Sequence, residues 1–283
     1  MNPRSGDESP TAGELVREAE RLGVETHLLA ADDDPRARAR EAVEGGAPAV
    51  GMAGGDGSLA AVAEVAVERD VPFVCIPFGT RNHFARDVGL DRDNPVDALR
   101  SFHGRERTVD VGTVNDRFFV NNVSLGVYAS FVHDPKRKTR NRLGAFLRMA
   151  PAALGRSRRP LSLTFDLGGR RRAHDALVVL VANNDYGLTT MADLSTRSRL
   201  DEGLLHAYVI EAADRRVLLA LLGKTVLGRA GEAEGMVEWT SAGFRVEFGR
   251  PRVHAAIDGE PVVLEPPLEF AIRPRSLRVL LPA

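Results

Sequence analysis

Hydrophobic and polar positions follow a helical period in parts of the first third of the chain. This period covers residues 12–23, 34–46 and 58–70. In the first of these segments Leu15, Ala19 and Leu22 share one face. Short apolar runs that predict strands lie between the helices, at residues 24–30, 47–53 and 71–78. Strands that alternate with helices predict an α/β domain with a parallel sheet covered on both faces.

The pattern changes after about Asp110, where apolar segments become short and are separated by turns. Predicted strands lie within residues 117–131, 161–167, 174–183, 204–211, 243–249, 252–264 and 268–274. Helical patterns interrupt them at residues 142–155 and 214–228. Short turns between strands are typical of antiparallel sheets. We therefore expect an α/β domain over residues 1–112 and a mostly antiparallel β domain over residues 113–283.

Composition and charge exclude several classes of protein. The chain has 283 residues and a formal net charge of −1, so no overall attraction to nucleic acid is expected. Cys75 is the single cysteine, which excludes an intramolecular disulfide and a cysteine zinc cluster. Its apolar surroundings predict a small buried hydrophobe. No apolar run approaches the roughly 18 residues of a membrane span, and the polar N-terminus is no signal peptide, so we expect a cytoplasmic protein.

Three loops contain the candidate chemistry of the first domain. The sequence GGDGS at residues 54–58 follows a predicted strand and begins a predicted helix. It is either a phosphate-binding loop, in which a magnesium ion joins Asp56 to the phosphate, or a plain turn with Ser58 as the helix N-cap. NPRSG at residues 2–6 and PFGTRNHFARDVG at residues 77–89 occupy equivalent positions, so all three loops should converge at one sheet edge. Gly79, Thr80 and Asn82 could donate hydrogen bonds to a nucleotide.

A further acidic sequence, IDGEP, lies near the C-terminus. Asp258 and Glu260 share one face if this segment is extended, whereas Asp258-Gly259 could instead form a tight turn. Taken alone, the sequence is more typical of a solvated hairpin tip than of a catalytic site. The accompanying glycine loops favour catalysis.

In combination, NPRSG, GGDGS, GTRNHFAR and IDGEP resemble the diacylglycerol kinase catalytic-domain family, which includes bacterial lipid kinases and sphingosine kinases. NNVSLGVYA and LDEG fall in the same order, so the resemblance covers essentially the whole chain. It implies a fold like that of NAD kinase and diacylglycerol kinase, and transfer of the γ-phosphate of ATP to a lipid hydroxyl. The residues that it places at the nucleotide are Asn2, Pro3, Arg4, Ser5, Gly6, Gly54, Gly55, Asp56, Gly57, Ser58, Gly79, Thr80 and Asn82.

The resemblance also implies catalytic and metal-binding roles. Asp56 would bind the catalytic Mg²⁺, and Glu260 would accept the proton of the lipid hydroxyl, with Asp258 close by. A structural Mg²⁺ would bind Glu202 and the carbonyls of Arg199 and Leu204. Glu202 replaces the usual Asp of the family, so Asp201 as the ligand, or an empty site, stays an alternative.

Three departures from the family pattern bear on the nucleotide loops. His83 stands where the family usually has Asp, and we interpret it as the start of a helix. Ala30 and Ala31 fall where a nucleotide-contacting Thr is common. NPRSG lies at the start of this sequence, without the strand that normally precedes it.

Cations gather between Pro135 and Arg172, where Asp166 is the one acid. Together with the apolar residues 142–155, they predict docking of the protein on an anionic membrane surface. We expect a lipid substrate there, no nucleic-acid partner, and a peripheral location at the inner membrane face. A homodimer is left open. The alternatives to a lipid kinase are an NAD kinase-like enzyme and a catalytically silent regulator that binds nucleotide or lipid.

Overall fold

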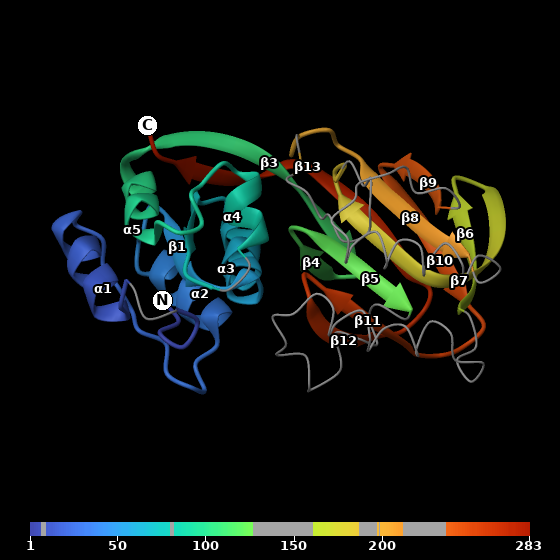
Figure 1. The fold of residues 1–283 in the computed structure, drawn as a ribbon, viewed down its shortest axis with the longest axis horizontal. Coiled ribbons are helices and arrows are strands. Elements are labelled where there is room, and N and C mark those ends of the chain that lie inside the picture. The colour runs from blue at the N-terminus through green and yellow to red at the C-terminus, as the bar shows by residue number, and fades with distance from the viewer. Residues whose placement is uncertain (7–9, 80–81, 127–160, 187–196, 198, 212–235) are drawn as a thin grey trace, which may run out of the picture. The chain divides into compact units, whose positions relative to one another are not determined.

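The chain folds into two compact units in a computed structural model. The structure describes residues 1–6, 10–79, 82–126, 161–186, 197, 199–211 and 236–283 (Figure 1). One unit contains Met1–Val111 and Arg273–Ala283, and the other contains Gly112–Ile272. We predicted a division into residues 1–112 and 113–283, whereas in the structure the C-terminal segment returns to the first unit.

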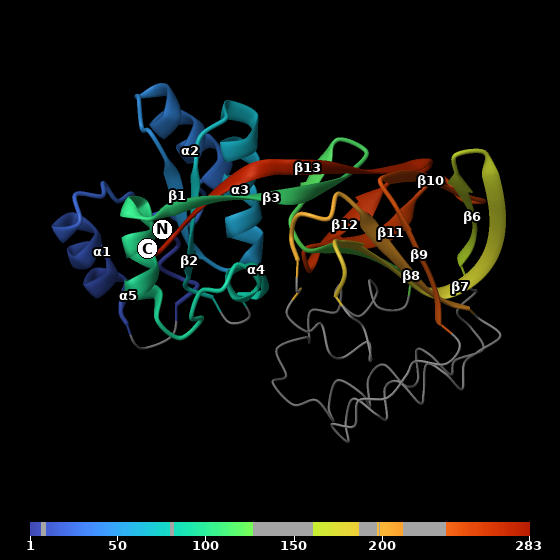
Figure 2. The same ribbon diagram turned by 90° about the horizontal axis from the view of Figure 1, so that it is seen from above.

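The first unit is an α/β domain with parallel strands. Its helices are α1 (Ala12–Arg21), α2 (Pro35–Glu44), α3 (Asp56–Arg69), α4 (His83–Asp87), α5 (Pro95–Ala98) and the 3-10 helix η1 (Leu99–His103). Strand β1 (Val50–Gly54) pairs in parallel with β2 (Phe73–Pro77), which pairs in parallel with the end of β13 (Leu268–Leu281). Figures 1 and 2 show α2 and α3 on one face of this sheet and α1 and α5 on the other. The predicted α/β class is confirmed.

Local sequence signals explain where the first helices begin. Thr11 and Glu14 form a reciprocal capping box at the start of α1. Asp34 caps α2, whose first residue, Pro35, needs no hydrogen bond for its nitrogen. Helix α3 is richer in alanine and valine than α1 and α2, and these residues pack against β1 and α2.

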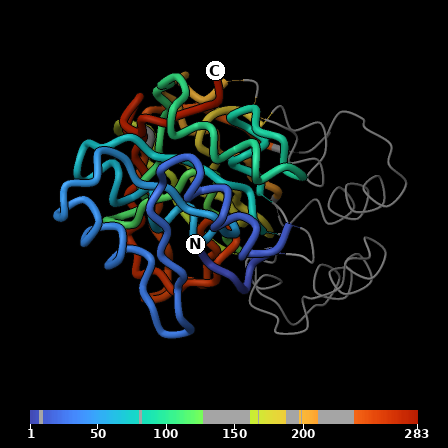
Figure 3. Tube along the Cα trace, turned by 90° about the vertical axis from the view of Figure 1, so that its left-hand side faces the viewer, coloured from blue at the N-terminus to red at the C-terminus, as the bar shows by residue number. Residues whose placement is uncertain are grey.

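The strand predicted at residues 24–30 is not formed. Within the described residues, the backbone hydrogen bonds of this segment to a neighbouring chain segment come from Met1, whose amine donates to His27 and whose carbonyl accepts from Leu29. Figure 3 shows the N-terminus near the centre of the view and the C-terminus at its upper rim.

The second unit is built from antiparallel strands, as predicted. Besides part of β13, they are β3 (Arg105–Val114), β4 (Arg117–Phe119), β5 (Asn122–Gly126), β6 (Leu161–Leu167), β7 (Arg170–Asn183), β8 (Leu205–Glu211), β9 (Met236–Ser241), β10 (Gly243–Phe248), β11 (Val253–Ile257) and β12 (Glu260–Leu264). Their order is β13-β10-β6-β7-β5-β11-β12, and β8 and β9 continue from β7. Strands β3 and β9 were not predicted, and the predicted helices at residues 142–155 and 214–228 lie outside the described residues.

Strands β3 and β13 run through the boundary between the two units. Inside the first unit, Arg278 of β13 forms a bidentate ion pair with Glu106 of β3, at 2.9 and 2.8 Å. This guanidinium lowers the pKa of Glu106. The buried Asp110 of β3 accepts a hydrogen bond from the backbone of Arg275. These contacts help to hold the end of β13 in the parallel sheet, next to β2.

Within the described part of the chain, no helix combines the length and the apolar character needed to span a membrane.

Candidate active site

Two glycine loops meet where the parallel strands β1 and β2 end. The strands pair as far as Gly54 and Pro77, and the nitrogen of Phe78 then donates to the carbonyl of Gly54 at 3.3 Å. A Cβ atom built on Gly79 would lie 2.5 Å from the Cα of Gly55. No real Cβ fits at that distance, so this backbone contact requires glycine at position 79.

The N-terminal loop joins the same edge. The nitrogen of Asn2 donates to the carbonyl of Ala53 at 2.8 Å. The Asn2 side chain accepts from the nitrogen of Arg4, which closes a turn over NPRSG. A Cβ on Gly6 would lie 2.2 Å from the ring of Phe78, in the loop after β2. The structure thus brings all three predicted loops together within the first unit.

The guanidinium of Arg4 extends from this turn to the connection between α1 and α2. It donates to the carbonyls of Ala30 and Ala31, at 3.2 and 3.4 Å. That connection is ordered by Asp33, whose carboxylate accepts from the nitrogen of Ala30 and from Arg38. The two hydrogen bonds lower the pKa of Asp33 to about 2. Arg4, although exposed, thus links the N-terminal loop to a connection that Asp33 orders.

Helix α3 presents its N-terminus to this junction. Gly55 is the N-cap residue, and no side chain of the described residues caps the helix. A Cβ on Gly55 would meet nothing within 4 Å, so open space lies beside it. The first N–H groups of a helix lack partners within the helix and favour a negatively charged ligand. Ser58, the alternative N-cap in our sequence analysis, lies within the first turn of α3.

Asp56 is the first residue of α3 and lies half-buried at the junction. Its carboxylate accepts from the backbone nitrogen of Phe84 in α4, at 3.4 Å. Cys75 of β2 is fully buried, as predicted. Burial raises the pKa of the Cys75 thiol, and the negative charge of Asp56 adds to this effect. Asp56 is thus the carboxylate that could hold a cation at this edge.

Asn82 lies in the loop but has its amide engaged by the loop itself. Its oxygen accepts from the nitrogen of Gly79 at 3.1 Å, and its NH₂ group donates to the carbonyl of Gly79 at 2.7 Å. The residue is buried and has φ of 47°. The structure therefore gives Asn82 a part in shaping the loop. His83 begins α4, as predicted, and Thr80 lies outside the described residues.

In the second unit, IDGEP forms the tight turn between β11 and β12. Ile257 pairs with Glu260, and Asp258 and Gly259 have φ of 47° and 83°. The turn alternative of the sequence analysis is therefore the one observed. Glu260 is exposed at the first position of β12. Asp56 belongs to the other unit, so a joint role for Asp56 and Glu260 stays a prediction.

The carboxylate of Asp258 is held by three successive backbone N–H groups. It accepts from Val120, Asn121 and Asn122, at 2.9, 2.7 and 3.0 Å. The nitrogen of Asp258 in turn donates to the carbonyl of Asn122. The side chain thus anchors the turn to the connection between β4 and β5.

Arg197 supports the same connection and was missed by the sequence analysis. Its guanidinium is buried and donates to the carbonyls of Val120 and Asn183 and to the side chain of Asn121. It also lies 5.3 Å from the ring centre of Tyr186. Asp258 therefore accepts hydrogen bonds from the N–H groups of this connection, and Arg197 donates hydrogen bonds to its oxygen atoms.

The predicted structural metal site stays a prediction. The carbonyl of Leu204 accepts from the nitrogen of Asn184, and the side chain of Asn184 accepts from the nitrogen of Glu202. The carboxylate of Glu202 lies 3.5 Å from Nε2 of His206. The side chain of Arg199 pairs with Asp201.

The basic segment lies largely outside the described residues. Among its described members, Arg170, Arg171 and Arg172 are exposed near the turn between β6 and β7. Arg171 pairs with Glu247 at 2.8 Å and with Asp166 at 3.7 Å. A hollow of about 450 Å³ nearby has His174, Asp175 and Glu247 in its wall and does not include the IDGEP turn.

Comparison with known proteins assigns both halves of the chain. Residues 1–114 match the model of the diacylglycerol kinase catalytic domain, and residues 122–281 match that of the YegS C-terminal NAD kinase beta sandwich-like domain. Fold and loops together thus define a two-domain kinase architecture. The chain belongs to the diacylglycerol kinase family of lipid kinases.

Relatives with curated names agree with this assignment. The chain is 26% identical to a diacylglycerol kinase of Bacillus subtilis, over 80% of this chain and 78% of the relative. It is 28% identical to a diacylglycerol kinase of Mycobacterium tuberculosis, over 90% and 81%. It is 27% identical to a probable lipid kinase YegS-like of Pseudomonas fluorescens, over 98% and 91%.

The fold is also that of a solved structure. A crystal structure of a putative diacylglycerol kinase from Bacillus anthracis aligns with a TM-score of 0.75. The alignment covers 99% of this chain and 94% of the other, at 16% identity.

We predict that Gly79→Ala destabilises the first unit more than Gly55→Ala does. At position 79 the added methyl meets the Gly55 backbone, and overpacking of this kind costs about 1–3 kcal/mol. At position 55 it meets open space, so the cost is limited to a poorer N-cap, about 0.5–1 kcal/mol. Urea denaturation of both variants measures the difference. Equal free energies of unfolding would contradict the inferred contact.

We further predict that Asp258→Asn destabilises the second unit. An amide can accept through one oxygen only, so at least one of the three N–H groups loses its partner, at about 1–3 kcal/mol. Glu265→Gln, at an exposed position after β12, is the control and should change the free energy of unfolding by less than about 0.5 kcal/mol. Urea denaturation is again the measurement, and an unchanged midpoint for Asp258→Asn would refute the anchoring role.

Proposed function

We propose that the protein is an ATP-dependent lipid kinase that transfers the γ-phosphate to a lipid hydroxyl. The observation that supports this most is the junction of three loops at the uncapped N-terminus of α3. Such a junction supplies backbone N–H groups beside open space, which suits a phosphate chain. Membership of the lipid kinase family, and relatives that are named diacylglycerol kinase, supports the choice of a lipid acceptor.

The residues of the junction fit a nucleotide with its magnesium ion. Gly55 leaves space beside the N-terminus of α3, where a phosphate can approach the backbone closely. Asp56 offers a carboxylate at the same point, an oxygen ligand of the kind that Mg²⁺ prefers. A bound Mg²⁺ would neutralise the charge that develops on the transferred phosphate. In our proposal Asp56 holds the ion, and the loops of Asn2–Gly6 and Gly79 orient the nucleotide.

In the second unit we assign proton acceptance to Glu260 and positioning to Asp258. Glu260 is exposed at the end of a tight turn, so its carboxylate can reach an incoming hydroxyl. Asp258 has its carboxylate occupied by three backbone N–H groups and is better suited to fixing the turn. General base catalysis of this kind typically contributes about 10²–10⁴-fold to the rate.

A lipid acceptor implies contact with a membrane surface, and we propose a peripheral location at the inner face of the membrane. The exposed Arg170 and Arg172 are described members of the basic segment that could contact anionic headgroups.

The proposal is tested with labelled ATP, Mg²⁺ and three acceptors: diacylglycerol in mixed micelles, a total lipid extract, and NAD. We expect a labelled lipid, which is then identified by mass. Asp56→Asn and Glu260→Gln should each lower its rate of formation about 100-fold or more.

Two matched controls separate these roles from a general loss of charge. Glu68→Gln removes another carboxylate from α3, and Glu265→Gln removes one just after β12; both should keep their activity. Labelling of NAD in place of lipid would contradict the proposal. So would nucleotide binding without phosphate transfer to any of the acceptors.

A further inference from the structure

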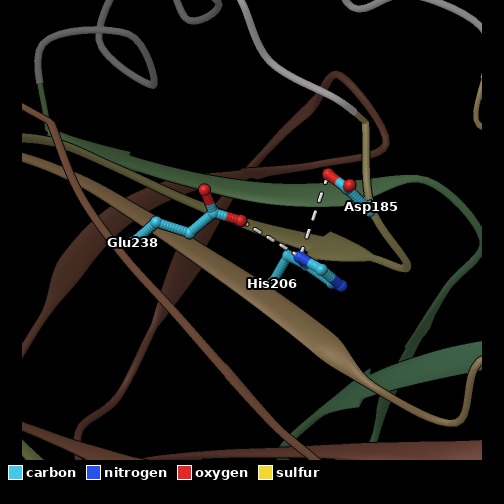
Figure 4. A group of neighbouring side chains, drawn as sticks. All are labelled: Asp185, His206 and Glu238. Carbon is cyan, nitrogen blue, oxygen red and sulfur yellow. Dashed lines mark hydrogen bonds and ion pairs between the residues drawn. The ribbon is translucent and has the colours of Figure 1, made fainter. Parts of the chain in front are cut away.

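His206 of β8 lies among three carboxylates in the second unit. Its Nδ1 atom is 3.2 Å from Glu238 and 3.9 Å from Asp185, and its Nε2 atom is 3.5 Å from Glu202. The imidazole is only 9% exposed, whereas the side chains of Glu238 and Asp185 are 44% and 43% exposed. Figure 4 shows Nδ1 directed toward the carboxylates of Glu238 and Asp185. The cluster is therefore closed on the side of the ring and open on the side of the acids.

The hydrogen-bonding capacity of His206 does not match these neighbours. A neutral imidazole has one N–H donor and one lone pair, and here both nitrogens face carboxylates. Nε2 is buried without a hydrogen-bond partner in the described part of the chain. If Nδ1 carries the proton, the lone pair of Nε2 is directed at Glu202; if Nε2 carries it, the lone pair of Nδ1 is directed at two acids. A cation beside Nδ1 removes the conflict, because Nε2–H can then donate to Glu202.

The surrounding strands hold the ligand atoms in place. Tyr208, which follows His206 on the same face of β8, donates to Asp185 at 2.8 Å. It lies directly opposite Glu238 in the antiparallel pair of β8 and β9. Burial, followed by the hydrogen bond to Asp185, raises the pKa of Tyr208, so its hydroxyl stays a donor. The carboxylate of Asp185 is thus oriented by the Tyr208 hydroxyl, and that of Glu238 is placed by the register of β8 and β9.

We propose that Asp185, His206 and Glu238 bind a divalent first-row transition metal, with Zn²⁺ as the reference ion. The three ligand atoms all lie within 4.8 Å of one another. Ligands about 2.0–2.1 Å from a tetrahedral zinc are about 3.3 Å apart, close to the 3.2 Å between His206 and Glu238. Imidazole nitrogen favours Zn²⁺ over Mg²⁺. Glu202 then orients the ring from outside, in a carboxylate–histidine–metal arrangement.

This metal site is distinct from the magnesium site expected at Glu202 and the carbonyls of Arg199 and Leu204. It uses the Nδ1 atom of His206, whereas Glu202 faces Nε2, and its side chains come from β8, β9 and the segment after β7. It goes beyond the proposed kinase function, because it assigns no step of phosphate transfer to the metal and its test needs no nucleotide.

The test is calorimetric titration of the full chain, without a polyhistidine tag or nucleotide, with Zn²⁺ at pH 7.5. We expect one saturable site whose affinity falls at least tenfold in Glu238→Gln. Glu247→Gln is the control, since this glutamate on β10 is similarly exposed but pairs with Arg171. It should bind Zn²⁺ as the unchanged chain does. His206→Gln, checked for folding by circular dichroism, should lose the site.

Two results would overturn the proposal. One is equal Zn²⁺ affinity in the unchanged chain and in Glu238→Gln, which would place any bound zinc elsewhere. The other is the absence of saturable Zn²⁺ binding to the unchanged chain. Competition with millimolar Mg²⁺ adds a check, because an imidazole-containing site should not release Zn²⁺ to Mg²⁺.

Discussion

The approach of Gly79 to Gly55 is the contact on which the junction of the three loops depends. Parallel pairing brings β1 and β2 to the same edge, but it does not by itself bring the following loops together. That step needs position 79 to lack a Cβ, because such an atom would lie 2.5 Å from the neighbouring backbone. Phe78, held in the same loop, then provides the surface against which Gly6 packs. The absence of a Cβ at position 79 thus permits the loops after β1 and β2 to approach each other, and the N-terminal loop joins them through Gly6 and Asn2.

In the second unit the IDGEP turn is fixed by a different means, because an acid and a base bind the same backbone segment. Asp258 accepts hydrogen bonds from N–H groups of the connection between β4 and β5, and Arg197 donates hydrogen bonds to its oxygen atoms. Buried charges are costly unless they are hydrogen-bonded in this way. The turn is held rigid as a result, while Glu260, two residues beyond Asp258, stays exposed. His206 presents a contrasting case, because its buried Nε2 atom has no hydrogen-bond partner among the described residues.

Periodicity and loop residues predicted the fold class, most strands and the three loops, because these depend on local sequence. Residues 24–30 were predicted as a strand from their apolar pattern, but a strand also needs a ladder of backbone hydrogen bonds, and within the described residues this segment forms such bonds to a neighbouring segment only with Met1. The sequence did not predict that the Asn82 amide forms hydrogen bonds with the backbone of Gly79, and the role of Asn82 at the nucleotide stays a prediction. Arg197 and the cluster around His206 carry no local signal, since their partners come from distant strands. Only the register of β8 and β9 brings Glu238 to His206.

The most direct test of the junction is hydrogen–deuterium exchange with and without saturating Mg·ATP. Exchange should slow together in residues 2–6, 54–59 and 77–84, because one ligand covers three loops that meet at Gly55 and Gly79. Protection of only one loop, or unchanged exchange in all three, would contradict a shared nucleotide site.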